Sequence, residues 1–259
     1  MEGKIAYRTV LWAFCIAWGA SFCILVGNRL GFLGYGTPLY WALFIPGALS
    51  PAIGAWVVLV KNRTMTSKEL LATIFAIRQP VRMYLLTLGF IVVYFGAGIV
   101  TGIFEYQSFD YVSLLAFPLM IIGGGLEEVG WRYVLNPALE RKLPFAVACL
   151  VTGVLWSIWH LPFFFEEGSS QYEMNFLVFA IGSIGLSFAY AALYRISKSV
   201  WLCVLIHALN NSLYGSFVMK VDEFSTAALP TAVTALILIV ASLFAVAVVE
   251  RKKGTAASG

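Results

Sequence analysis

Two adjacent carboxylates and an arginine stand in a stretch that is otherwise apolar, with Glu127 and Glu128 followed by Arg132. A charged side chain in hydrocarbon costs from a few to about 10 kcal/mol or more unless it is paired or hydrated, so such a cluster indicates a functional site. Residues four apart on a helix share a face, whereas neighbours diverge by about 100°. We therefore expect Glu128 to pair with Arg132, which leaves Glu127 free to act as a general base. The alternative is that all three residues are structural.

The chain has two histidines, His160 and His207, and both lie in apolar stretches. Neutral imidazole is cheaper to bury than a charge, and two histidines at this depth with none elsewhere favour a site. Asn211 follows His207 by four residues, so both side chains should point into the same space. Donors aimed at a developing oxyanion lower an acyl-transfer barrier by about 3 kcal/mol each. The alternative for this pair is hydrogen bonding between helices, which is common for Asn in membranes.

Aromatic residues and glycines surround these positions. Trp156 precedes His160 by four residues, and Trp159 adjoins it. Both tryptophans are predicted to lie in the lipid belt or the core rather than against substrate, because aromatic residues are enriched at membrane interfaces. The run 123–125 consists of three glycines, which would let another helix approach closely or would break the helix before Glu127.

The elements that position these residues must cross a membrane. Hydrophobic residues make up 61% of the 259 residues and charged residues 12%, and the mean hydropathy is +0.87, a balance outside that of soluble domains. The fold class is predicted to be all-α, a bundle of about eight transmembrane helices around an intramembrane polar cavity, in a single membrane domain over residues 1–259. Eight runs of suitable length lie at Thr9 to Val26, Leu39 to Val60, Met83 to Phe104, Tyr111 to Leu126, Phe145 to Phe165, Met174 to Tyr194, Val200 to Met219 and Thr231 to Val249.

Basic residues gather in alternate loops and at both ends of the chain, which predicts cytoplasmic N- and C-termini by the positive-inside rule. This anchoring against membrane lipid explains the net charge of +4, so no nucleic-acid partner is expected. The plasma membrane is the expected location in a prokaryote. The four cysteines lie in apolar runs without metal-type spacing and are expected to be buried rather than disulfide-bonded.

Three motifs in order resemble those of the type II CAAX prenyl endopeptidases, in the CPBP (CAAX protease and bacteriocin-processing) group of intramembrane proteases. They are Glu-Glu-x-x-x-Arg at residues 127–132, an aromatic residue and histidine at Trp156 and His160, and His-x-x-x-Asn at His207 and Asn211. The resemblance covers about residues 115–213. Trp156 stands where the family usually has Phe, which keeps the aromatic character.

The resemblance implies an eight-helix bundle with a water-filled cavity, in which Glu127 and His160 activate a water for attack on a peptide carbonyl. His207 and Asn211 would form the oxyanion hole, and Glu128 and Arg132 would position the site. The implied substrate is a membrane-associated peptide or protein, either prenylated or hydrophobic.

A metal is the main chemical alternative, because two histidines and a glutamate can also hold a catalytic Zn²⁺ with its bound water. The ligands would be Glu127, His160 and His207, but the signature His-Glu-x-x-His is absent, and a metal-free glutamate mechanism is favoured. Two other functions stay open. Intramembrane Glu, His and Arg also build proton-coupled transporters, although no duplicated halves are found, and a scaffold or immunity protein could carry the same residues without cleaving a peptide.

Overall fold

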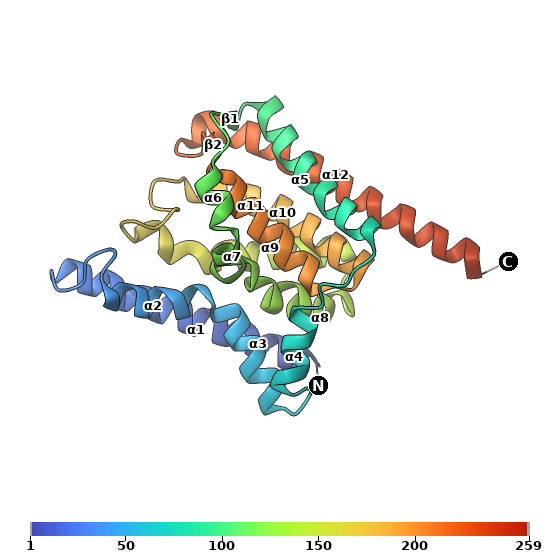
Figure 1. Ribbon diagram of the computed structural model, residues 1–259, viewed down its shortest axis with the longest axis horizontal. Helices are drawn as coiled ribbons and strands as arrows, with labels where there is room; N and C mark the ends of the chain where they lie inside the picture. Colours follow the sequence, from blue (N-terminus) through green and yellow to red (C-terminus); the bar gives the residue numbers. More distant parts are fainter. Residues whose placement is uncertain (1, 258–259) are drawn as a thin grey trace.

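The protein is described by a computed structural model covering residues 2–257, with side chains for residues 3–252. Almost all of its regular structure is helical (Figure 1). The elements in chain order are α1 (Glu2–Arg29), α2 (Pro38–Ala48), α3 (Ser50–Lys61), α4 (Ser67–Ile74), α5 (Val81–Thr101), β1 (Phe104–Tyr106), α6 (Tyr111–Leu115), α7 (Phe117–Met120), η1 (Ile121–Gly125), η2 (Val129–Leu135), α8 (Asn136–Glu140), α9 (Phe145–His160), η3 (Leu161–Phe165), α10 (Phe176–Ser197), α11 (Val200–Tyr214), β2 (Phe217–Met219) and α12 (Phe224–Ala257).

Five helical segments of the described chain are long and apolar enough to cross a membrane, or six if the bent pair α2 and α3 counts as one span. The five are Gly3–Arg29, Val81–Thr101, Phe145–Phe165, Phe176–Ser197 and Phe224–Lys252. The all-α class and the polytopic membrane character are therefore confirmed. Eight continuous spans are not found, because three of the predicted runs are broken or short. The cytoplasmic placement of the termini stays a prediction.

The second predicted run is broken by prolines. Pro46 lies inside α2 and Pro51 lies in the first turn of α3, and the two helices meet at an angle of 58°. Proline lacks the N–H that a continuous helix needs and clashes with the preceding turn. The seventh predicted run is short for a different reason, because α11 ends at Tyr214 and the chain then turns into β2.

The fourth predicted run is the most irregular, and it leads into the carboxylate motif. Asp110 accepts hydrogen bonds from the backbone N–H groups of Val112 and Ser113 and so begins α6. The chain then passes through α7 into two π-helical segments, η1 and η2, which flank Glu127 and Glu128. The predicted break at the three glycines is confirmed. Wide turns of this kind occur often at functional sites because they redirect side chains out of a regular helix.

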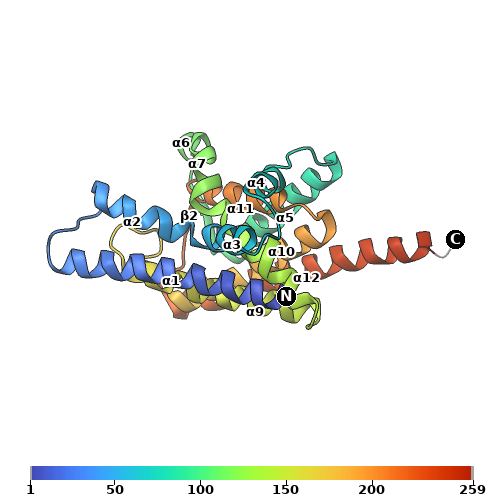
Figure 2. The ribbon, with the colours of Figure 1, turned by 90° about the horizontal axis from the view of Figure 1, so that it is seen from below.

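The core forms around α10, which packs most extensively against α12 and α9. Helices α5 and α12 run beside each other along one side of the molecule, and α12 extends beyond the rest of the bundle towards the C-terminus (Figure 1). On the opposite side α1 packs along α2 and α3 (Figure 2). Asn175 begins α10 by accepting from the N–H groups of Leu177 and Val178. Helix α10 contacts both α9 and α11, the two helices that carry the histidines.

One small antiparallel sheet, absent from the prediction, joins the end of α5 to the end of α11. Strand β1 pairs with β2, with Phe104 opposite Met219 and Tyr106 opposite Phe217. Gly102, with a φ of 81°, ends α5 in the left-handed conformation and turns the chain into β1. Strands of three residues are too short for a period-two pattern to be recognised inside an apolar run.

Candidate active site

The predicted catalytic residues come from three separate parts of the chain and line one cavity. Glu127 lies at the junction of η1 and η2, His160 ends α9, and His207 and Asn211 lie on α11. All four line a cavity of about 450 Å³. Three of them, the glutamate and the two histidines, are buried. The structure therefore brings together the residues that the sequence analysis singled out, whereas their catalytic roles stay a prediction.

Glu127 is held by a tryptophan. Its Oε2 accepts a hydrogen bond of 2.8 Å from Nε1–H of Trp156, on α9. The indole ring of Trp156 also lies 5.7 Å from the imidazole of His160 and 5.4 Å from that of His207, measured between ring centroids. Trp156 thus touches the carboxylate and both histidines, and a phenylalanine could not make the hydrogen bond.

Glu128 bridges two partners instead of one. Its Oε2 lies 3.3 Å from Nε of Arg132, as the spacing predicted, and its Oε1 lies 2.8 Å from Nδ1 of His207. Glu128 and Arg132 are both fully buried. An ionised carboxylate can only accept hydrogen bonds, so Nδ1 of His207 carries a proton. The ion pair predicted within one helix therefore also fixes the orientation of a cavity residue on another helix.

Arg132 is further held by aromatic rings. Its guanidinium carbon lies 5.1 Å from the ring centroid of Trp156 and 5.4 Å from that of Tyr190. Attraction between a cation and a ring face is strongest where both are desolvated. Tyr190 also accepts a hydrogen bond of 2.7 Å from Nδ2–H of Asn210. The sequence did not predict the contacts of Trp156 and Tyr190 with charged groups, because either aromatic residue is equally consistent with core packing.

His160 is oriented through its own helix. Its Nδ1 lies 2.9 Å from the carbonyl oxygen of Trp156, one turn earlier. A carbonyl only accepts, so Nδ1 carries the proton, and Nε2 of the neutral ring is an acceptor. The rings of Trp159 and Phe179 lie 4.6 Å and 5.0 Å from the imidazole and hold it in place. The ring therefore has a basic nitrogen that makes no hydrogen bond to the described part of the chain.

Asn211 lies beside Gly124 of η1. A Cβ added to Gly124 would clash with the amide nitrogen of Asn211 and would lie 3.1 Å from Nε2 of His207. Only glycine allows α11 to approach this closely, as expected from the close helix approach predicted for the glycine run. Within the described residues the Asn211 amide makes no hydrogen bond, so its donors remain available to a bound group.

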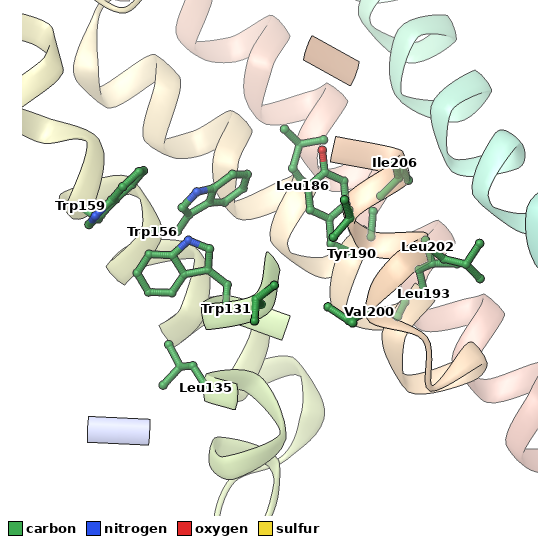
Figure 3. Packing of buried hydrophobic residues seen from close by; sticks show 14 of the residues in the cluster. Trp131, Leu135, Trp156, Trp159, Leu186, Tyr190, Leu193, Val200, Leu202 and Ile206 are labelled. Carbon is green, nitrogen blue, oxygen red and sulfur yellow. The ribbon is translucent and has the colours of Figure 1, made fainter. Parts of the chain in front are cut away.

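Trp156 and Trp159 are both buried, so they lie in the core and not in the lipid belt. Both also line the cavity, which the prediction did not expect. They lie near each other and Trp131, with Tyr190 beyond Trp156 on the side of α10 (Figure 3). Nε1–H of Trp159 donates to Oγ of Ser50 at 3.0 Å and so ties α9 to α3. Trp156 therefore binds the Glu127 carboxylate, whereas Trp159 connects α9 to the neighbouring helix α3.

Replacing Trp156 by Phe is expected to lower kcat/KM by about 10- to 100-fold, because a hydrogen bond to a charged group contributes about 1.5–3 kcal/mol. The measurement is peptide cleavage by the purified variant in lipid. Trp201→Phe is the matched control, because Nε1–H of Trp201 donates to the hydroxyl of Tyr84 outside the cavity. We expect it to lower the unfolding temperature more than the cleavage rate. A Trp156→Phe variant as active as the wild type would show that the hydrogen bond to Glu127 has no part in the reaction.

The alternative metal ligands are Glu127, His160 and His207. Among the described residues, no three His, Cys, Asp or Glu side chains lie together as a metal ion would require. Nδ1 of His207 is hydrogen-bonded to Glu128 and Nδ1 of His160 to a backbone carbonyl, and a histidine that binds a metal through Nε2 makes the same kind of contact. The metal-free mechanism therefore stays a prediction.

Comparison with known proteins gives two matches. Residues 109–213 match a family described as type II CAAX prenyl endopeptidase, Rce1-like. The chain is also 25% identical over 210 residues to a CAAX prenyl protease 2 of Methanococcus maripaludis, which covers 71% of this chain and 76% of that protein. The matched region contains every motif on which the resemblance rested, and the resemblance is confirmed. Both matches favour a protease over a transporter or a scaffold.

Proposed function

We propose that this protein, whose residues 109–213 belong to the Rce1-like family of type II CAAX prenyl endopeptidases, cleaves peptide bonds by means of a water activated by Glu127 and His160. The observation that carries the proposal is the convergence of Glu127, His160, His207 and Asn211 on one cavity. Side chains so far apart in the sequence meet there only because the helix breaks at η1 and because α11 packs against the glycines of that break.

Glu127 is assigned as the general base. The water gives a proton to its carboxylate while its oxygen bonds to the peptide carbonyl carbon, and the same proton then passes to the leaving nitrogen as the C–N bond breaks. His160 is assigned to orient the water, since its Nε2 is an acceptor when Nδ1 donates to the Trp156 carbonyl. The hydrogen bond from Trp156 keeps the Glu127 carboxylate in one orientation.

The donors assigned to bind the oxyanion are the N–H groups at Nδ2 of Asn211 and Nε2 of His207. Because Nδ1 of His207 donates to Glu128, Nε2 can donate as well only when the ring is protonated. The Glu128 carboxylate is placed to stabilise that imidazolium, and Arg132 holds the carboxylate. Donors fixed in a buried cavity stabilise a developing oxyanion without reorganising during the reaction.

Asn211→Ala is expected to lower kcat by about 10²- to 10³-fold with little change in KM, which is the usual cost of one oxyanion donor. The neighbouring Asn210→Ala is the matched control, because that amide donates to Tyr190 instead, and we expect its kcat to stay within a few-fold of the wild type. The measurement is the kcat and KM of both variants from steady-state cleavage kinetics. An Asn211→Ala variant whose only defect is a raised KM would point to substrate binding instead.

The proposed substrate is a lipidated or hydrophobic peptide at the membrane. Most of the cavity lining is apolar, with contributions from Phe44, Phe104, Met120, Phe179 and Leu186, and burial of apolar surface contributes about 25 cal/mol per Å². The name of the archaeal relative, a CAAX prenyl protease, supports a prenylated C-terminal tail as the first substrate to test.

The test is cleavage of a farnesylated CAAX peptide and of an unprenylated hydrophobic peptide by the purified protein in liposomes, with products identified by mass spectrometry. Cleavage of either supports an endopeptidase, and cleavage of neither overturns it. The same preparation, assayed with and without a chelator and analysed for bound metal, tests the metal-free mechanism. We expect full activity after chelation, and activity that is lost and then restored by Zn²⁺ would contradict it.

A further inference from the structure

The small sheet beside the cavity has an open edge. The N–H of Lys220 donates to the carbonyl of Ile103 at 3.0 Å, and the N–H of Gln107 donates to the carbonyl of Ser216 at 3.1 Å. In an antiparallel pair such hydrogen-bonded positions alternate with positions whose backbone groups point away from the partner strand. The register of the sheet therefore turns the N–H and C=O groups of Phe217 and Met219 outward, away from β1.

Part of this outer edge already binds a neighbouring segment. Val221 is the next residue whose backbone groups point outward, and its carbonyl oxygen accepts a hydrogen bond of 2.8 Å from the N–H of Asn175. Within the described residues, the outward groups of Phe217 and Met219 have no hydrogen-bond partner. An unpaired backbone group costs several kcal/mol where hydrocarbon surrounds it, so this edge must meet water or another strand.

The same edge belongs to the wall of the cavity. Met219 and Val221 line it, as do Gln171 and Met174 from the segment beside that edge. Strand β2 also follows directly from α11, so that Phe217 is six residues beyond Asn211. An extended chain placed along β2 would thus lie in the wall that Glu127 and His160 share.

The two faces of the sheet differ in polarity. Phe104 and Tyr106 of β1 share one face with Phe217 and Met219 of β2, and aromatic contacts join Phe217 to Phe104 and Tyr106. The other face carries Glu105 and Lys220, which form an exposed ion pair of 2.8 Å. A strand added to the edge would alternate in the same way, with every second side chain on the apolar face.

We propose that the substrate polypeptide binds in an extended conformation as a third strand on the outer edge of β2, with its backbone paired to the N–H and C=O groups of Phe217 and Met219. This inference rests on the proposed function and adds how the substrate is held. A helical substrate must unwind before cleavage, because a helix has no backbone groups to offer the edge. Binding by strand addition depends on the backbone, whereas the apolar face selects alternate side chains.

The test removes one outward N–H at a time. Met219→Pro deletes the donor on the proposed edge, and proline is tolerated where an edge N–H points outward. Tyr106→Pro is the matched control, since its N–H points outward from the opposite edge. Each is compared with the alanine variant at the same position, so that side-chain loss cancels. The probes are the farnesylated CAAX peptide and the unprenylated hydrophobic peptide in liposomes.

Met219→Pro is expected to raise KM about tenfold over Met219→Ala, from the lost hydrogen bond and the blocked approach of the peptide. Tyr106→Pro and Tyr106→Ala should differ by less than about twofold, since no ligand hydrogen bond is lost there. Equal KM values for the two Met219 variants, or an equal proline effect at Tyr106, would overturn the proposal.

A second measurement keeps the test decisive if Met219→Pro fails to fold. Peptides in which one amide N–H at a time is replaced by an ester oxygen are bound to the Glu127→Gln variant. Affinity losses at every second position support strand pairing, and equal losses at all positions or none overturn it.

Hydrogen exchange of the Glu127→Gln variant separates this inference from the proposed function. Slower exchange at Phe217 and Met219 on addition of peptide supports the open edge even if the wild type cleaves neither peptide, a result that overturns only the protease. No protection in a protein that does cleave the peptide overturns the edge and leaves the protease standing.

Discussion

Replacing Arg132 by Met is expected to lower the free energy of unfolding by about 3–5 kcal/mol, the usual cost of removing one partner of a buried ion pair. The Arg132 side chain is fully buried between Glu128, Trp156 and Tyr190. Methionine fills much of the same space, so the loss is mainly that of the charge opposite Glu128. The measurement is reversible denaturation of the purified variant in detergent.

The double variant Arg132→Met with Glu128→Gln is the control, because it removes both charges. It should be more stable than the sum of the two single effects implies, as expected for residues in direct contact. If Arg132→Met alone costs less than about 1 kcal/mol, a value typical of an exposed pair, then the pair does not behave as a buried one.

Replacing Glu127 by Gln is expected to lower kcat by about 10⁴-fold, the upper range for loss of a general base. Gln keeps the size of the side chain, and its amide oxygen can still accept the Nε1–H of Trp156. We therefore expect an unfolding temperature close to that of the wild type. The measurement is single-turnover peptide cleavage in liposomes, together with a denaturation curve.

The exposed Glu167 provides the matched control for this variant. Glu167→Gln makes the same chemical change outside the cavity, and it should leave kcat within about twofold, since exposed substitutions away from special features have small effects. A Glu127→Gln variant that cleaves at the wild-type rate would remove Glu127 from the reaction, and one that fails to fold would assign it a structural role.

The class of the fold could be predicted because it depends on local patterns. Apolar runs of membrane length follow from composition, and the pairing of Glu128 with Arg132 follows from their spacing on one helix turn. Motifs on three segments indicated which residues should meet. The cavity then collects Glu127, His160, His207 and Asn211, as expected.

Contacts between segments could not be predicted, because they depend on how the helices pack. The sequence gives no register of α11 against η2, and so the hydrogen bond between His207 and Glu128 was not foreseen. The same holds for the N–H of Trp156, whose aromatic character suited core packing as well as contact with Glu127. Three of the eight predicted spans are broken or short for a related reason, since prolines and short strands interrupt runs that remain apolar throughout.

The most direct test of the account compares Glu127→Gln, His160→Gln and the double variant in one single-turnover cleavage assay. If both side chains act on the same water, removing either one already prevents its activation. The double variant should then be about as slow as the slower single variant, because the effects of residues that act together are strongly non-additive. Losses that multiply in the double variant would show two independent contributions and would contradict a single water activated by Glu127 and His160.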